Sequence, residues 1–241
     1  MNIYISERQF DPAVIEMTDR ADNRPDMFRQ NLKNLRIINR YFGGLGSVKK
    51  YLLRLIKQMD PQKKIEILDL ATGSADHPLA IVALAKKIGC DVAITAVDNN
   101  PQVLDIARER TASIKNIKIQ QKDILNLDYA SQSFDIVLCS LTLHHFSWEQ
   151  AAHILKEMQR LSRVGFIVND LGRSRLAALT VWLYIHFTTR NPMTHHDAYI
   201  SILRAFTSEE FAALARQAGI KKFAIDKHLF FRLILTGEMH E

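Results

Sequence analysis

Short apolar runs alternate with amphipathic segments over most of the chain. Apolar runs predict strands and segments with a helical period predict helices, in the order strand 65–70, helix 79–88, strand 92–97, helix 101–111, strand 116–120, strand 134–140, helix 149–162, strand 164–169 and helix 207–218. This alternation is typical of βαβ units, which build a parallel, doubly wound sheet. Two last runs, 222–227 and 230–236, follow one another closely, as in an antiparallel hairpin. The pattern therefore predicts an α/β fold whose sheet ends in an antiparallel hairpin.

The first 64 residues lie outside this pattern. Residues 1–28 show little periodicity, so we expect a loosely structured arm. A helix is predicted from Arg29 to the glycines at 43–46, and a second helix follows over 48–59. We therefore divide the chain into an arm with a helical lid (1–64) and a main domain (65–241).

Residues 172–205 form an insertion between the last parallel strand and the last helix. Its apolar stretch 176–187 predicts a helix that lies near a ligand pocket and covers it with large side chains, namely Trp182, Tyr184 and Phe187. The alternative is an ordinary core helix followed by a loop.

Composition places the chain among globular proteins, because 47% of its 241 residues are hydrophobic and 24% are charged. The longest apolar stretch, 176–187, is shorter than the ~20 residues that span a bilayer, and the first residues contain no apolar run. We therefore expect no membrane span and no signal peptide. Two cysteines make neither a disulfide scaffold nor, alone, a structural zinc site. A reducing cytoplasm is the expected compartment, and both a monomer and a homodimer fit.

The net charge of +6 is local. Residues 29–64 carry +9, residues 1–28 carry −3, and residues 65–241 hold 19 basic and 19 acidic side chains. Arg29, Lys33, Arg36 and Arg40 form one stripe along the first predicted helix. A solvated helix face, or a lid over a bound ligand, explains this charge without nucleic acid.

Candidate ligand-binding residues follow three predicted strands. Small residues including Ala71 and Gly73 form a loop before a helix, where backbone N–H groups can approach a ligand. Asp98 ends the next strand, where a carboxylate can accept both hydroxyl hydrogens of a ribose. Asp123 and Ile124 follow the third strand, where they can contact an adenine ring. Each element alone is explained by a tight turn or a helix cap, but their joint order favours a nucleoside site.

The loop after the first strand differs from a dinucleotide-binding loop. The three glycine positions of G-x-G-x-x-G/A are occupied by Ala71, Gly73 and Asp76. Because an acid at the third position repels phosphate, we expect a ligand without phosphate. Alanine allows close approach but disfavours positive φ, so Gly73 is expected to adopt that conformation alone among residues 71, 73 and 75.

These segments resemble the motifs of class I S-adenosylmethionine-dependent methyltransferases, which have a Rossmann-like sheet. The matching segments are ILDLATGSAD, AVDNNPQVLDIARER, QKDI, FDIVLCSLTLHHF and FTSEEFAALARQAGI, within residues 65–170 and 205–237. The resemblance implies that S-adenosylmethionine is the cofactor. It implies a cofactor site made of Ala71 and Gly73 (methionine part), Asp98 (ribose), Asp123 and Ile124 (adenine) and Ser140 (sulfonium region). Asn99, next to Asp98, is a further cofactor candidate, and Arg40 of the basic stripe is expected to reach the cofactor carboxylate if its helix is a lid.

Leu143-His144-His145-Phe146 follows the fourth strand and is expected beside the transferred methyl group. In small-molecule O-methyltransferases, a Leu-His-Asp-Trp segment supplies the catalytic base here, and His144 is the matching position. His145 and Asp170 are the other candidates, and pocket lining is the alternative role. We assign no metal ligands, because adjacent histidines such as His195 and His196 point in different directions on regular structure.

Two further segments resemble methyltransferases associated with type III polyketide synthases in bacteria: IEMTDRADNRPDMFRQNLKNLRIINRYFGG and NDLGRSRLA. This resemblance implies methyl transfer to a hydroxyl of a small, largely apolar, aromatic or polyketide-derived molecule. The alternatives are an RNA methyltransferase that uses the basic helices, a binding subunit without catalysis, and a dehydrogenase, which Asp76 disfavours. We expect a small-molecule acceptor and no nucleic acid.

Overall fold

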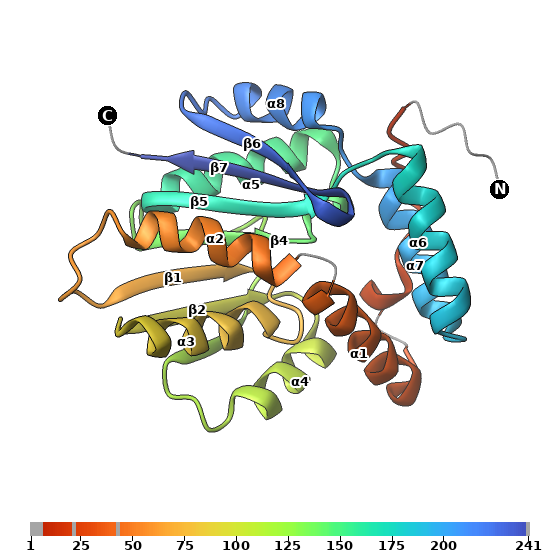
Figure 1. The fold of residues 1–241 in the computed structure, drawn as a ribbon, viewed down its shortest axis with the longest axis horizontal. Helices are drawn as coiled ribbons and strands as arrows, with labels where there is room; N and C mark the ends of the chain where they lie inside the picture. Colours follow the sequence, from red (N-terminus) through yellow and green to blue (C-terminus); the bar gives the residue numbers. More distant parts are fainter. Residues whose placement is uncertain (1–6, 21–22, 42–43, 240–241) are drawn as a thin grey trace.

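A seven-stranded mixed sheet forms the centre of the computed structural model, which describes residues 7–20, 23–41 and 44–239 (Figure 1). The strand order is β3-β2-β1-β4-β5-β7-β6, and β7 runs antiparallel to both of its neighbours. The strands are β1 (Ile65–Leu70), β2 (Val92–Asp98), β3 (Ile117–Gln121), β4 (Phe134–Ser140), β5 (Ser162–Leu171), β6 (Phe223–His228) and β7 (Arg232–Glu238). The predicted doubly wound sheet and its closing hairpin are confirmed.

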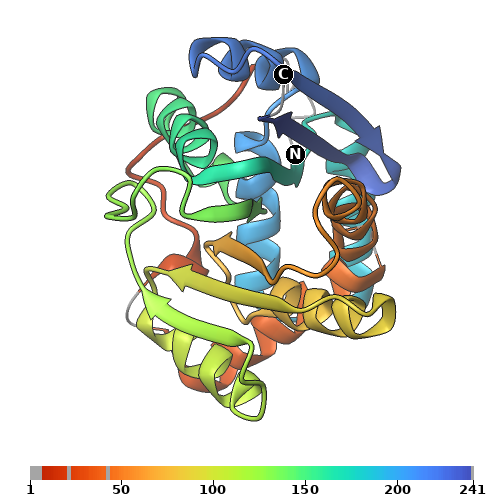
Figure 2. The same ribbon diagram turned by 90° about the vertical axis from the view of Figure 1, so that its left-hand side faces the viewer.

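Helices cover both faces of this sheet. One layer holds α2 (Gly44–Ile56) and α3 (Asp76–Ile88), and the opposite layer holds α5 (Trp148–Leu161) and α8 (Ser208–Gln217) (Figures 1 and 2). The helix α4 (Pro101–Thr111) packs along β2 and β3. α5 and α8 each begin with a capping box, in which a hydroxyl and the side chain of the third helical residue satisfy backbone N–H groups reciprocally.

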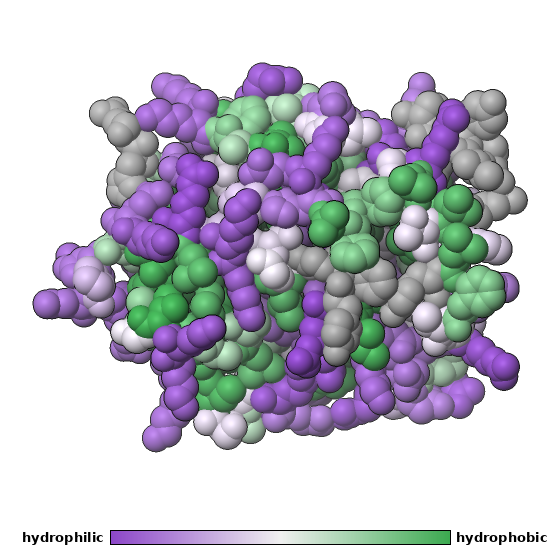
Figure 3. Space-filling model, viewed as in Figure 1, coloured by the Kyte–Doolittle hydropathy of each residue, from purple (hydrophilic) through white to green (hydrophobic). Residues whose placement is uncertain are grey.

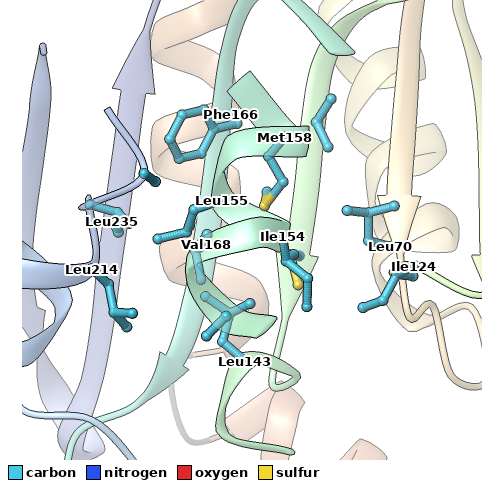
Figure 4. Packing of buried hydrophobic residues seen from close by; sticks show 14 of the residues in the cluster. Leu70, Ile124, Leu143, Ile154, Leu155, Met158, Phe166, Val168, Leu214 and Leu235 are labelled. Carbon is cyan, nitrogen blue, oxygen red and sulfur yellow. The ribbon is translucent and has the colours of Figure 1, made fainter. Parts of the chain in front are cut away.

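The core between β4, β5 and α5 extends down to the turn that follows β4. Leu155 and Met158 of α5 and Phe166 and Val168 of β5 are fully buried, and Leu143 packs at the lower end of the same cluster (Figure 4). Burying a leucine side chain contributes roughly 1.5–3 kcal/mol. Leu143 therefore anchors the 3-10 turn η2 (Leu143–His145), which carries the two histidines.

Three helices gather at the end of the sheet where its parallel strands finish (Figure 1). They are α1 (Pro25–Tyr41), α6 (Arg175–Thr188) and α7 (Pro192–Arg204). Phe28 and Leu32 of α1 pack with Val103 and Ile106 of α4 and with Met193 of α7. The insertion 172–205 thus consists of two helices, where the sequence predicted one helix.

The N-terminal helices differ from prediction in position. α1 begins at Pro25, and Gly44, which was expected to end it, is the first residue of α2. A side chain at Gly44 would lie 3.1 Å from the Asn39 carbonyl, so the glycine here permits close approach of two helices. α2 also packs on the sheet through Val48, Leu52 and Leu55, whereas α1 lies beyond the strand ends.

α6 exposes an apolar face. Figure 3 shows hydrophobic surface along this helix. Leu179, Trp182 and Leu183 are each about two fifths exposed, and Phe187 is 80% exposed. The prediction that Trp182 and Phe187 cover the pocket is therefore wrong, because both side chains reach solvent; the side chain of Tyr184 lies outside the described part. Within the described residues, the structure contains no helix long and apolar enough to cross a membrane.

Candidate active site

A cavity of about 560 Å³ opens at the carboxyl ends of β1, β2 and β4. Its walls come from the loops after these strands, from α1, α6 and α7, and from the arm that precedes α1. Of the predicted site residues, it brings together Ala71, Gly73, Asp98, Asn99, Ile124, Ser140, His144 and His145.

The loop after β1 turns tightly through three residues with positive φ. Ala71, Gly73 and Ala75 have φ values of 51°, 57° and 61°, so the prediction that glycine alone adopts this conformation is wrong. The turn is held by the Thr72 hydroxyl, which donates to Asp69 at 2.6 Å, and by the Thr72 amide, which donates to the Val97 carbonyl. These bonds stabilise a conformation that costs an alanine roughly 1–2 kcal/mol.

Asp98 fixes the same loop from the end of β2. Its carboxylate accepts the Gly73 amide at 2.9 Å and the Asn100 amide at 3.0 Å, one on each oxygen. Burial raises the pKa of Asp98 above its ordinary value, although these amide bonds oppose the rise. Each carboxylate oxygen can accept a second hydrogen bond, so the residue can still take both hydroxyls of a ribose.

Ile124 and Ser140 border the same space. Ile124 is buried and contributes an apolar wall, as expected for a ring-binding position. The Ser140 hydroxyl accepts the Asn169 side-chain amide at 2.8 Å, which holds it at the end of β4. Both positions fit the parts that the resemblance implies for them.

Two predicted cofactor residues lie elsewhere. The Asp123 carboxylate accepts the Leu125 amide and the Asn126 side chain, each at 2.9 Å, and so holds its own turn. Arg40 is exposed, and neither residue lines the cavity.

A buried arginine lines the cavity in their place. Arg232, the first residue of β7, is 2% exposed and donates to the Asn39 side chain at 3.2 Å. Burial lowers its pKa to about 10, and nearby Asp170 opposes the shift, so it stays a cation at neutral pH. Its charge also helps to lower the pKa of His77, on the first turn of α3. The sequence signal that could have indicated this residue is an arginine at the start of an apolar predicted strand.

Asp76 is compensated by two arginines. Its carboxylate lies 2.6 Å from Arg110 and 3.4 Å from Arg36, which belongs to the basic stripe of α1. Asp76 therefore repels a phosphate less than the sequence suggested. The expectation of a ligand without phosphate depended on that repulsion.

His144 forms a buried pair with Asp170. Its Nδ1 lies 2.6 Å from one carboxylate oxygen, and its backbone amide donates to the other at 3.2 Å. Burial would raise the pKa of Asp170, but His144 beside it holds that pKa below its ordinary value. An ionised Asp170 keeps the proton on Nδ1, so Nε2 of the neutral ring is an acceptor.

His145 lies between two acids of the arm. Its Nδ1 is 2.8 Å from Asp19, and its Nε2 is 3.8 Å from Glu16. Burial would lower the pKa of His145, but Glu16 and Asp19 raise it to about 10. An imidazolium at this place cannot accept a proton, which makes His144 the better base candidate.

Residues 7–20 of the arm are an ordered part of the site, whereas the sequence predicted a loosely structured arm. Asp197 of α7 accepts the Met17 amide at 2.6 Å, the Thr18 amide at 2.9 Å and the Thr18 hydroxyl at 2.6 Å. These bonds hold the 3-10 turn η1 (Met17–Asp19). Ser201 of α7 donates to Glu16 at 2.7 Å.

The histidines next to Asp197 do not join His144 and His145. His195 Nε2 lies 2.8 Å from the Thr189 carbonyl, and His196 Nδ1 lies 3.0 Å from Asp197. The sequence offered residues 195–197 as possible metal ligands. In the structure, the Asp197 carboxylate instead positions the arm through its bonds to Met17 and Thr18.

Comparison with known proteins identifies the central part of the chain. Residues 67–165 match the family model described as "Methyltransferase domain". This segment includes most of β1, all of β2, β3 and β4, and the turn with His144 and His145. Over these residues the chain is similar to a methyltransferase domain. The domain and its pocket indicate S-adenosylmethionine as the cofactor, in line with the class I resemblance.

Curated relatives cover the same part. A demethylmenaquinone methyltransferase from Staphylococcus aureus (strain MRSA252) is 31% identical over 122 residues, which are 51% of this chain and 48% of that protein. The chain therefore spans about half the length of the curated relatives it matches.

Solved structures share the fold over nearly the whole chain. A methyltransferase from Aquifex aeolicus, described as SAM dependent, covers 96% of this chain and 100% of its own with a TM-score of 0.60 at 14% identity. The magnesium protoporphyrin IX methyltransferase from Synechocystis PCC 6803, solved with bound SAH, covers 89% of this chain and 94% of its own with a TM-score of 0.60 at 15% identity. These likenesses support the methyltransferase fold of the chain.

Proposed function

We propose that this protein transfers the methyl group of S-adenosylmethionine to a hydroxyl oxygen of a small, largely apolar acceptor. The observation that carries the proposal is the buried His144–Asp170 pair, in which His144 lines the cavity together with the cofactor residues. The division into an arm with a helical lid (1–64) and a catalytic domain (65–241) is part of the proposal, with the arm and α1 as the parts that border the cavity.

The cofactor residues follow from the walls of the cavity. The loop with Ala71 and Gly73 would hold the methionine part, Asp98 and Asn99 the ribose, Ile124 the adenine face, and Ser140 the sulfonium region. We assign the counter-charge of the carboxylate to Arg232 in place of Arg40, because Arg232 is a buried cation on the cavity wall. When bound, S-adenosylmethionine supplies an electrophilic methyl group for an in-line displacement.

His144 would take the proton of the acceptor hydroxyl at Nε2. Asp170 then holds the resulting imidazolium through Nδ1, as in other carboxylate-histidine pairs that remove protons. Closure by the arm and α1 would exclude water and orient the acceptor. A methyl transfer to oxygen needs this proton removed, which is why a buried base at this place favours a hydroxyl.

An apolar acceptor is supported by the far wall of the cavity. Leu32 and Leu35 of α1, Val181 of α6 and Ile202 of α7 line it. An aromatic or polyketide-derived phenol has the required combination of a hydroxyl and an apolar body. The resemblance of the arm and of the NDLGRSRLA segment to type III polyketide synthase-associated methyltransferases supports the same class.

An RNA substrate receives less support from the basic stripe of α1. Arg29 pairs with Glu109 of α4 at 2.9 Å, and Arg36 pairs with Asp76 at 3.4 Å. Acids of the catalytic domain therefore compensate two arginines of the stripe, which leaves less charge for phosphate contacts.

The test is transfer of a labelled methyl group from S-adenosylmethionine to a panel of phenolic acceptors, with the product located by NMR. Methylation at oxygen is expected. Methylation at a ring carbon would overturn the oxygen assignment, and labelled RNA would favour the RNA alternative. Cofactor binding without transfer to any acceptor would favour a non-catalytic binding subunit.

A further inference from the structure

Three donor atoms converge at one end of the cavity. Glu16 Oε1 lies 3.8 Å from His144 Nε2, and Glu16 Oε2 lies 3.8 Å from His145 Nε2. One ligand atom from each residue lies within 4.8 Å of the other two. Two donors of one tetrahedral zinc ion lie about 3.4 Å apart, so small side-chain rotations would bring the three atoms to coordination distance.

The other nitrogen of each ring is already held by a carboxylate. His144 Nδ1 is 2.6 Å from Asp170, and His145 Nδ1 is 2.8 Å from Asp19. Histidines that ligate metals almost always donate their second ring N–H in this way, which fixes the tautomer and directs the free nitrogen to the metal. Both histidines of this cluster have that arrangement.

The charge of the cluster favours a cation. Glu16, Asp19 and Asp170 place three carboxylates around two imidazoles, so the cluster keeps a negative charge even when both rings are protonated. Arg8 and Arg232 act on Asp170, and Arg204 acts on Asp19, so these cations offset part of the charge from outside the cluster. The hydrogen bonds of Arg8 and Arg204 go to backbone carbonyl oxygens. A divalent cation would supply the missing charge within the cluster itself.

The 3-10 turn explains why adjacent histidines can act together. The His144 and His145 rings have centroids 4.4 Å apart and planes tilted by 39°, whereas the sequence argument assumed that neighbouring histidines diverge. Burial of Leu143 in the core fixes the turn that produces this convergence.

We propose that Glu16, His144 and His145 form a binding site for a divalent transition-metal ion. Two imidazoles and one carboxylate suit zinc, cobalt, iron and manganese, and the open coordination positions would face the cavity, which all three residues line. The site does not rest on the proposed function. One consequence alone rests on the proposed function: if His144 is the base, the ion and an acceptor proton would compete for His144 Nε2, so loaded and metal-free protein should differ in activity.

The test is a titration of the untagged full chain with Co²⁺ and with Zn²⁺ in chelator-treated buffer, followed by calorimetry and by visible absorption of bound cobalt. One ion per chain is expected. Glu16→Gln and His145→Gln should each weaken binding by at least about 10-fold, as should Asp19→Asn, which removes the carboxylate behind a ligand. The matched control is His153→Gln, on an exposed histidine of α5, which should bind like the wild type.

Failure of the wild type to bind either ion at millimolar concentration would overturn the proposal, as would unchanged affinity in Glu16→Gln and His145→Gln. Binding of S-adenosylhomocysteine to the same variants shows that they are folded. A measurement on the wild type alone serves if they are not: X-ray absorption of the Zn²⁺-loaded protein should show two imidazole nitrogens at about 2.0–2.1 Å from the ion. A zinc shell without imidazole would also contradict the site.

Discussion

The two ends of the cavity are built in different ways. The proposed cofactor end is built mainly from segments that directly follow β1, β2, β3 and β4, and its bond between Gly73 and Asp98 joins residues 25 positions apart. The proposed acceptor end joins the arm to the turn after β4 and to α7, with Asp19 and His145 126 positions apart and Met17 and Asp197 180 positions apart. The carboxyl ends of parallel strands meet at one edge of the sheet, which brings the cofactor-end residues together. The acceptor-end residues come together only when the arm docks. Changes at the two ends should therefore separate cofactor binding from turnover.

The largest effect is expected at the acceptor end. His144→Ala removes the proposed base and should lower kcat by about 10²–10⁴-fold, while the Kd of S-adenosylmethionine stays within about twofold. Steady-state kinetics and calorimetry measure the two quantities. His153→Ala is the control, and an unchanged kcat in His144→Ala would remove this residue from the mechanism.

The complementary change is Asp98→Ala at the cofactor end. It removes the proposed ribose acceptors and the bond to the Gly73 amide, each worth about 1.5–3 kcal/mol for a charged partner. The Kd of S-adenosylhomocysteine should rise by at least about 10-fold. A matched change is Asp123→Ala, whose carboxylate holds only its own turn and should leave the Kd nearly unchanged. Equal losses in both variants would refute the assignment.

Asp197→Asn tests the docking of the arm. An amide at this position cannot accept as strongly from the Met17 and Thr18 amides, so Glu16 and Asp19 should lose their fixed positions. We expect KM for the acceptor to rise by about 3–10-fold, in line with about 1 kcal/mol for a weakened charged hydrogen bond. Limited proteolysis after Arg20 should become faster. A resistant arm with an unchanged KM would show that Asp197 does not position it.

The smallest effect concerns pH. His145 has a pKa raised to about 10 in the folded protein, against about 6.5 when exposed, so its stabilisation is complete below pH ~6.5 and is lost as pH rises through ~10. With chelator present, the Tm difference between wild type and His145→Gln should shrink over this interval, by about 2–4 °C for each kcal/mol lost. A difference that stays constant or grows would contradict the ion pairs with Glu16 and Asp19.

Sequence reasoning succeeded where the signal is local. Strand periodicity and small residues after a strand predicted the order of strands and helices along the main domain, and placed Gly73, Asp98 and Ser140 at or just after strand ends. It failed for Ala71, because hydrogen bonds of Thr72 stabilise a φ that alanine alone disfavours.

The remaining errors are contacts between distant segments. Nothing in the period of residues 7–20 predicts that Glu16 and Asp19 meet the histidines, since the three bonds to Asp197 that bring them there connect opposite ends of the chain. The role of Arg232 could not be predicted either, because the sequence does not show that the start of β7 lies beside the cavity.

Calorimetric titration of the full chain with S-adenosylmethionine tests the central claim most directly, because both ends of the cavity are defined around that molecule. The account predicts one molecule bound per chain, competition by S-adenosylhomocysteine, weakened binding in Asp98→Ala and retained binding in His144→Ala. No binding to the wild type, or an equal loss in the two variants, would contradict it.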